Sequence, residues 1–220
     1  MMHVFVTGGT GYIGQRLIAE LVTRGHRVRA LVRPASAARV PGVAVVTGDA
    51  LRSDDVAAAL QQGETLVHLV GTPHPNPSKA AEFERIDLES IRASVAASRR
   101  TGIAHLVYVS VAQPAPTMRA YAAVRAAGEA EIAAAGLTAT ILRPWYVLGP
   151  GHWWPIVLTP FYALAKLMPG MRETARRMDL VTIGAMTTAL VAAVESPPPK
   201  GTQRIVDVPA IQRASLDPRR

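Results

Sequence analysis

An α/β fold with one largely parallel sheet is what this sequence predicts, and three observations support it. Short apolar runs alternate with longer helical patterns along the chain, as in strands joined by crossover helices. The 220 residues suffice for one well-buried domain but are short for two. A glycine-spaced turn follows the first apolar run directly. We therefore expect a single doubly wound parallel sheet of about seven strands.

The glycine-rich turn lies between a predicted strand at 4–6 and a helix predicted at 12–24. Its glycines are Gly8, Gly9, Gly11 and Gly14, so two overlapping spacings, G-x-G-x-x-G and G-x-x-G-x-x-G, end at the last of them. Glycines allow a tight turn and let the backbone approach a pyrophosphate, while the helix N-terminus offers unpaired N–H groups. A strand before the turn and a helix after it are typical of the Rossmann-type dinucleotide-binding fold.

The end of the second predicted strand, 26–33, indicates the type of dinucleotide. An acidic residue there accepts the ribose 2′-hydroxyl of NAD, whereas an arginine accommodates the 2′-phosphate of NADP. This chain has Arg33, and no acidic residue stands between Glu20 and Asp49. The guanidinium suits a phosphate by its charge and its planar donors, so NADP is the predicted cofactor. NAD is the alternative, with Arg33 as an ordinary exposed arginine.

The remaining elements continue the alternation. Strands are expected at 43–47, 65–70, 105–110, 137–142 and 204–208, with a short strand-like stretch at 180–183, and helices at 53–62, 78–100, 118–135 and 184–195. Ser53 is expected to cap its helix. We interpret His68, inside an apolar strand, as a packed core histidine. Ser110 stands at the carboxyl end of a parallel strand, where open α/β sheets place their ligands.

The helix at 118–135 carries three polar side chains at four-residue spacing, Tyr121, Arg125 and Glu129, which therefore share one face. An ion pair between Arg125 and Glu129 on the surface is one interpretation of this row. The stretch 143–155 is rich in proline and glycine, and we expect no regular structure there.

The C-terminal part, 151–220, is expected to complete the domain formed by 1–150. Its apolar stretch at 153–169 predicts a helix that covers the substrate, and a last helix and strand follow. A membrane span needs about 20 apolar residues without interruption, and this stretch carries Pro155, Pro160 and Lys166. Contact of 153–169 with a membrane surface is the alternative. The tail at 215–220 is expected to be frayed.

The net charge of +8 and pI near 10.6 raise the question of a polyanionic partner. Arginine supplies 21 of the 24 basic residues, but the arginines are scattered, so we expect no nucleic acid and a small-molecule substrate instead. With no cysteine there is no disulfide and no cysteine catalysis. The six histidines lack ligand spacing, so no metal site is predicted. We expect a cytoplasmic protein, and no oligomeric state is predicted.

With TGGTGYIG, Ser110, Tyr121 and the Arg143–Pro144 turn in place, the chain resembles the atypical short-chain dehydrogenase/reductases over residues 2–151. It is most similar to the compact NmrA-like and complex-I-subunit-like members related to NAD-dependent epimerases and dehydratases. The resemblance implies a set of cofactor-binding residues. These are Gly8, Thr10, Gly11, Tyr12, Ile13, Gly14, Arg33, Asp49, Ala50, Val70, Gly71 and Pro144.

The same resemblance implies that Tyr121 is the catalytic tyrosine. The family pattern Tyr-x-x-x-Lys here ends in Arg125, and Asp87 lies near where many relatives carry asparagine. The expected function is an NADP(H)-dependent oxidoreductase acting on a small, fairly apolar carbonyl or alcohol. In it Ser110 orients the substrate oxygen, Tyr121 is the general acid or base, and Arg125 supports it. The alternative is a non-catalytic NAD(P)H-binding sensor or assembly protein.

Overall fold

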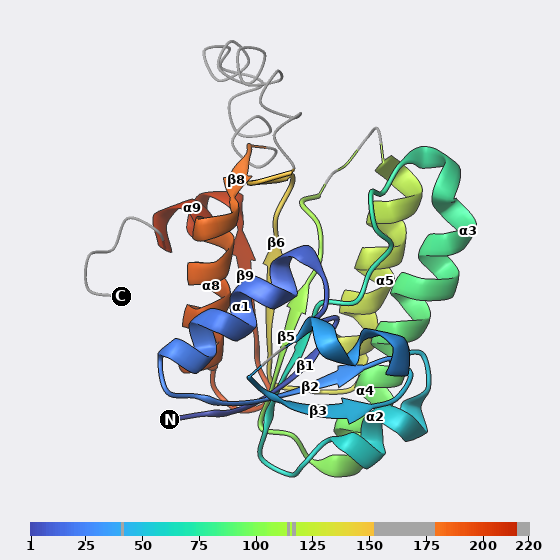
Figure 1. Ribbon diagram of the computed structural model, residues 1–220. Coiled ribbons are helices and arrows are strands. Elements are labelled where there is room, and N and C mark those ends of the chain that lie inside the picture. Colours follow the sequence, from blue (N-terminus) through green and yellow to red (C-terminus); the bar gives the residue numbers. More distant parts are fainter. Residues whose placement is uncertain (41, 114, 116–117, 152–178, 215–220) are drawn as a thin grey trace.

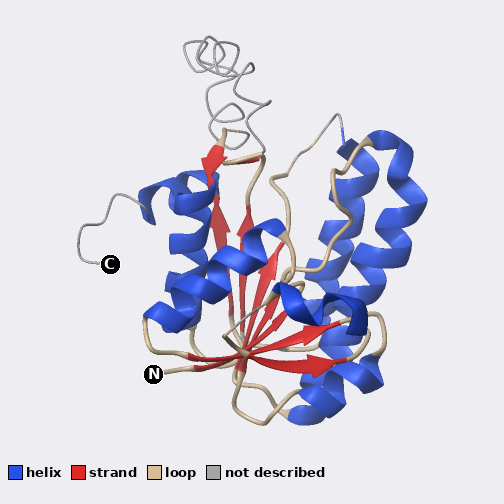
Figure 2. Cartoon of the chain, in the orientation of Figure 1, coloured by secondary structure: helices blue, strands red, loops and turns tan. Residues whose placement is uncertain are grey.

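A parallel sheet lies between two layers of helices in the computed structural model, which describes residues 1–40, 42–113, 115, 118–151 and 179–214 (Figures 1 and 2). The sheet has seven strands in the order β3-β2-β1-β4-β5-β6-β9, all parallel to their neighbours. In chain order the strands are β1 (His3–Thr7), β2 (Arg27–Val32), β3 (Ala44–Thr47), β4 (Thr65–His68), β5 (His105–Val109), β6 (Ala139–Arg143) and β9 (Gln203–Asp207). The prediction of a doubly wound sheet is confirmed.

The strand order reverses between β1 and β4. The chain first moves outward from β1 to β3 and then returns to pair β4 with the other side of β1. The helices that follow β1 and β4 therefore lie on opposite faces, which leaves a crevice at the carboxyl ends of these two strands. Ligands of open α/β sheets bind in such a crevice.

One face of the sheet is covered by α1 (Tyr12–Thr23), α8 (Ile183–Glu195) and α9 (Val208–Ala214) (Figure 1). Their apolar side chains form one buried cluster with the sheet, in which Leu17, Leu21, Met186 and Leu190 are fully buried. The first helix ends as expected, because Gly25 has φ +78° and its N–H donates to Val22 O at 2.9 Å.

The opposite face is covered by α2 (Ser53–Ala59), α4 (Glu89–Thr101) and α5 (Arg119–Ala134). The continuous helix predicted at 78–100 is instead divided into η2 (Pro77–Lys79), α3 (Ala80–Glu82), η3 (Phe83–Leu88) and α4. The η3 segment is a π-helix, whose wider turn is frequent at functional sites. It directs Phe83 and Asp87 inward, and both are fully buried.

Other predictions need correction. Ser53 is not the cap of α2, since Arg52 occupies that position and makes no side-chain cap bond. The stretch 143–155 was expected to be irregular, yet β7 (Val147–Leu148) pairs with β8 (Val181–Thr182). The short helices α9 and η1 (Pro34–Arg39) were not predicted.

The apolar helix predicted at 153–169 and the tail at 215–220 lie outside the described residues. Among the helices that the structure describes, none combines the length and the apolar character that crossing a membrane requires.

His68 lies at the end of β4 and is fully buried, which confirms a packed core histidine. Its Nδ1 atom lies 3.0 Å from both Thr7 Oγ1 and Ser94 Oγ, and its Nε2 atom lies 3.2 Å from Ser90 Oγ. Burial, together with the nearby charge of Arg125, lowers the pKa of His68 to about 3. The folded protein therefore holds this ring in its neutral form.

This burial predicts acid sensitivity. The unfolded chain binds a proton at His68 below its ordinary pKa of 6.5, whereas the folded chain does so only near pH 3. The free energy of unfolding should therefore fall as the pH drops from 6.5, by at most about 1.4 kcal/mol per pH unit from this group. Urea denaturation between pH 7 and 4.5 should show a flatter dependence for His68→Gln. Substitution of the exposed His3 by Gln is the control, and an unchanged slope in His68→Gln would contradict the prediction.

Candidate functional site

The glycine turn is held at the crevice by backbone contacts that only glycine permits. Gly8 has φ +76°, and a Cβ atom on it would lie 2.6 Å from the carbonyl carbon of Leu69, just after β4. A Cβ atom on Gly14 would lie 2.5 Å from Gly8 O, so α1 packs directly on the turn. Gly11 instead has only Gly8 O near its Cβ position, and its N–H donates to that oxygen at 3.0 Å. The turn therefore joins β1, β4 and α1 and leaves its Gly11 side open.

A cavity of about 490 Å³ lies along this turn and the ends of β1, β2 and β4. Eight of the predicted cofactor-binding residues line it: Gly8, Thr10, Gly11, Arg33, Asp49, Ala50, Val70 and Gly71. Arg33 is exposed, and its guanidinium makes no hydrogen bond or ion pair with another described residue. Arg85, from η3, places a second guanidinium in the wall. The cavity thus combines a glycine-lined floor with two cations.

A second cavity of about 490 Å³ has Ile13, the second residue of α1, in its wall, whereas Thr10 and Gly11 line the first cavity. Ser110, Tyr121 and Pro144 are also in its wall, so the structure brings together residues from β1–α1, β5, α5 and the end of β6. Most of the remaining wall is apolar or aromatic. Its other members are His74, Pro75, Asn76, Val109, Val111, Met118, Trp145, Tyr146 and Val147.

Three of the predicted site residues line neither cavity, namely Tyr12, Gly14 and Arg125. Tyr12 begins α1, and the guanidinium carbon of Arg16 lies over its ring, 4.2 Å from the centroid of the Tyr12 ring. Gly14 packs against the turn itself. These two residues therefore belong to the start of α1 without lining a cavity.

Arg125 is buried in the wall between the two cavities. Its Nη2 atom donates to Asp87 Oδ1 at 2.5 Å, and its Nη1 atom donates to Val109 O at 2.9 Å. The Cβ position of Gly71 faces the same guanidinium, so a side chain there would displace it. Asp87 also accepts hydrogen bonds from the N–H and hydroxyl of Thr72, at 3.0 and 2.6 Å. The ion pair therefore fixes the ends of β4 and β5 to η3 and α5.

The charge of Arg125 is permanent. Burial by itself lowers the pKa of this guanidinium, but Tyr121, Tyr108 and Asp87 offset that effect and the pKa is raised overall. The guanidinium carbon lies 5.1 Å from the ring centroid of Tyr121, and the centroids of the Phe83 and Tyr121 rings are 4.9 Å apart. Tyr121 therefore contacts both a cation and an aromatic ring.

The surface ion pair between Arg125 and Glu129 is the interpretation that the structure shows to be wrong. Glu129 instead forms an ion pair with Arg143, at the end of β6, and accepts from Arg143 Nε at 3.0 Å. It also accepts the hydroxyl hydrogen of Ser110 at 2.5 Å. Arg125 and Glu129 are neighbours on one helix face, yet they bind partners on different elements of the fold.

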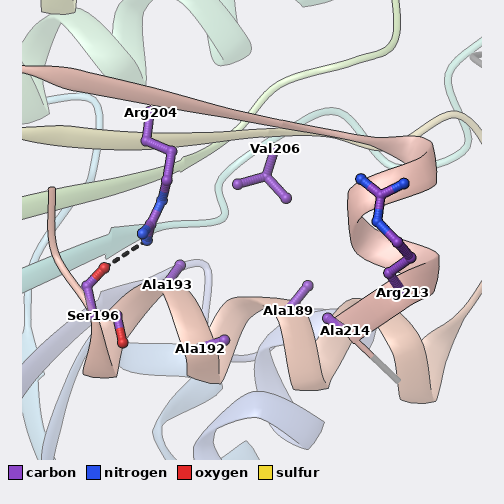
Figure 3. A pocket seen from close by; sticks show the side chains of 8 residues that line it. All are labelled: Ala189, Ala192, Ala193, Ser196, Arg204, Val206, Arg213 and Ala214. Atoms are coloured by element: carbon purple, nitrogen blue, oxygen red, sulfur yellow. Dashed lines mark hydrogen bonds between the residues drawn. The ribbon is translucent and has the colours of Figure 1, made fainter. Parts of the chain in front are cut away.

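A third cavity, of about 280 Å³, lies between α8, β9 and α9 (Figure 3). Its floor is made of Ala189, Ala192 and Ala193, and Arg204 at one end donates to Ser196 O at 2.6 Å. It shares no lining residue with the other two cavities. Within the described part of the chain, no group of three or more histidine or acidic side chains is arranged to hold a metal ion.

The glycine-lined cavity fits a dinucleotide. The N-terminus of α1, which begins just after Gly11, presents backbone N–H groups to a pyrophosphate, and a Cβ atom on Gly11 would narrow the approach. A family model described as NAD(P)H-binding matches residues 8–150. The chain belongs to this NAD(P)H-binding family. A nicotinamide dinucleotide is accordingly its cofactor.

Reductases and epimerases are among the proteins similar to this chain, as its sequence predicted. A ceramide reductase of Caulobacter vibrioides is 29% identical over 197 residues, which cover 88% of this chain. The match spans 61% of the length of that reductase.

Two solved structures share the fold. The enzyme WbmH of Bordetella bronchiseptica, in complex with NAD+, superposes with a TM-score of 0.69 at 20% identity, over 94% of this chain and 75% of that one. UDP-N-acetylglucosamine 4-epimerase of Bacillus cereus gives 0.68 at 18% identity, over 94% and 79%. These structures confirm the predicted Rossmann-type fold, and the family model confirms the predicted kinship with NAD(P)-binding proteins.

Several residues of the site escaped the sequence-based predictions. Trp145 and Tyr146 directly follow Pro144, so their place in the wall could have been inferred from that turn. Arg85 carries no such signal, because the π-helical turn changes which side chains face inward. Asp87 was singled out only through the family resemblance, and its pairing with Arg125 was not predicted. Glu129 was noticed on its helix, but its partners Ser110 and Arg143 lie on other elements.

The buried ion pair predicts a large effect on stability. Asp87→Asn leaves the guanidinium of Arg125 buried without a counter-charge, which should lower the free energy of unfolding by about 3 to 5 kcal/mol. The double variant Asp87→Asn/Arg125→Met removes both charges and should recover most of that loss. Urea denaturation measures both. Asp54→Asn, which breaks an exposed ion pair with Arg100, is the matched control, and an equally small effect of Asp87→Asn would contradict the prediction.

Proposed function

We propose that this protein is an NADP(H)-dependent oxidoreductase acting on a small, apolar carbonyl or alcohol. The observation that carries the proposal is the second cavity, in which Ser110 and Tyr121 stand in an otherwise largely apolar wall beside the nucleotide cradle. A phenol and a hydroxyl in such a wall can bind one substrate oxygen and move a proton to or from it. The substrate is a small molecule, and the relatives include a protein named as a ceramide reductase.

Each residue has a distinct task in this proposal. When bound, the nicotinamide dinucleotide donates or accepts a hydride. Tyr121 is the catalytic residue that gives a proton to a carbonyl oxygen, or takes one from an alcohol. Arg125 is a positioning residue, since it touches neither cavity but places a positive charge behind the Tyr121 ring. That charge stabilises the negative charge that develops on the phenol oxygen.

Arg33 supports NADP over NAD. It stands at the end of β2 in the wall of the nucleotide cavity, and the carboxylates among the described residues of that wall are Asp49 and Glu82. Neither follows β2, where an acidic residue would accept the ribose 2′-hydroxyl. A guanidinium at this position binds a 2′-phosphate through charge-assisted hydrogen bonds.

The protein should therefore bind NADPH at least about tenfold more tightly than NADH, the effect of one charged hydrogen bond. Arg33→Asp should abolish or reverse that preference, since a carboxylate repels a phosphate. Fluorescence titration of both nucleotides measures it. Arg39→Asp, an equal change of charge at the end of η1, is the control and should keep the preference. Equal affinities of the unmodified protein for the two nucleotides would refute the NADP assignment.

Tyr121→Phe should remove nearly all turnover and leave NADPH binding intact, because it deletes the proton-transferring hydroxyl and keeps the ring that packs on Phe83. The measurement is NADPH consumption with a panel of apolar ketones and aldehydes, beside NADPH titration of both proteins. If the unmodified protein binds NADPH but shows no turnover above the Tyr121→Phe level, the catalytic proposal fails. A non-catalytic NAD(P)H sensor would then be the better description.

A further inference from the structure

The hydrogen bond between Ser110 and Glu129 has a defined direction. Ser110 is 3% exposed, and its backbone N–H donates to Leu142 O at 2.7 Å, which fixes it at the end of β6. Its Oγ atom lies 2.5 Å from Glu129 Oε1. An ionised carboxylate can only accept hydrogen bonds, so the hydroxyl hydrogen of Ser110 points to Glu129.

The groups around Glu129 all donate hydrogen bonds to its carboxylate oxygens. Arg143 donates to both carboxylate oxygens through Nε and Nη2, and Gln113 Nε2 donates to Oε1 at 3.4 Å. The hydrogen bond to Glu129 raises the pKa of Arg143, so this guanidinium stays charged. With only donors around it, the carboxylate stays an acceptor for Ser110.

A hydroxyl group has one hydrogen to donate and two lone pairs to accept with. Since the hydrogen of Ser110 is directed to Glu129, this hydroxyl has only lone pairs left for a ligand of the second cavity, which Ser110 lines. No donor from the described residues bonds to this oxygen. A carbonyl oxygen has no hydrogen to offer, whereas an alcohol has one.

We propose that Glu129 is a positioning residue that makes Ser110 a hydrogen-bond acceptor, so that the second cavity selects ligands carrying a hydroxyl hydrogen. This inference rests on the proposed function and refines it: Ser110 binds the alcohol, and Tyr121 alone donates to a carbonyl. The two side chains thereby divide the roles, with Tyr121 as donor and Ser110 as acceptor. The favoured ligand class is a secondary alcohol with apolar substituents.

The test compares two ligands of the same shape, 2-octanol and 2-octanone, titrated calorimetrically into the protein without nucleotide so that no turnover occurs. Ser110→Ala should weaken the binding of 2-octanol about threefold to tenfold, the effect of one neutral hydrogen bond. It should leave the affinity for 2-octanone nearly unchanged. Ser110→Thr keeps the hydroxyl and should restore 2-octanol binding. Glu129→Gln should reduce the selectivity, because a neutral amide is a weaker acceptor and can itself donate. Glu131→Gln should change nothing: this half-exposed carboxylate lies on the same helix as Glu129 and pairs with Arg92 of α4.

Equal weakening of both ligands by Ser110→Ala, or greater weakening of 2-octanone, would overturn the proposal, as would failure of 2-octanol to bind. The outcome is separate from the test of catalysis. Selective loss of 2-octanol without any NADPH-dependent turnover would refute the oxidoreductase and leave the acceptor role of Ser110 standing. NADPH-dependent turnover combined with equally weakened binding of 2-octanol and 2-octanone would support the oxidoreductase and refute the acceptor role of Ser110.

Discussion

The architecture depends on how closely the glycine turn approaches the end of β4. At Gly8 there is no room for a Cβ atom against the backbone of Leu69 and Val70, and at Gly14 there is none against the turn itself. These two contacts place the N-terminus of α1 at the point where the strand order reverses. The nucleotide cavity on one side of the turn and the apolar cavity on the other both follow from that placement, since each takes lining residues from the turn.

The Arg125–Asp87 pair makes the boundary between the two cavities rigid. Both side chains are almost completely buried, and charges in such a setting persist only with partners for their hydrogen-bonding groups. Val109 O at the end of β5 and Thr72 after β4 supply such partners, whereas Arg125 Nε has none among the described residues. A cation that is fixed this firmly acts on Tyr121 by its field and not by entering the cavity.

Local sequence patterns predicted much of this fold. The apolar runs and the glycine turn specify their elements through neighbours in the chain, so the sheet and most of its helices could be inferred. The side-chain partners could not. Four-residue spacing suggested that Arg125 and Glu129 pair with each other. In the fold, Arg125 pairs with buried Asp87 and Glu129 pairs with Arg143, and both of these partners lie on other elements. The π-helical turn at Phe83–Leu88 was equally hidden, because a helical pattern of apolar residues does not reveal one extra residue in a turn.

Helix α5 links these features through its periodicity. Tyr121, Arg125 and Glu129 follow one another at intervals of four residues, which is about 6 Å along a helix axis. That interval matches the distances between separate targets, so one helix face delivers a phenol to the cavity, a cation to Asp87 and a carboxylate to Ser110. Moving the helix along its axis would disturb all three contacts at once. The buried ion pair in the middle of the row therefore sets the register of the two polar groups on either side of it.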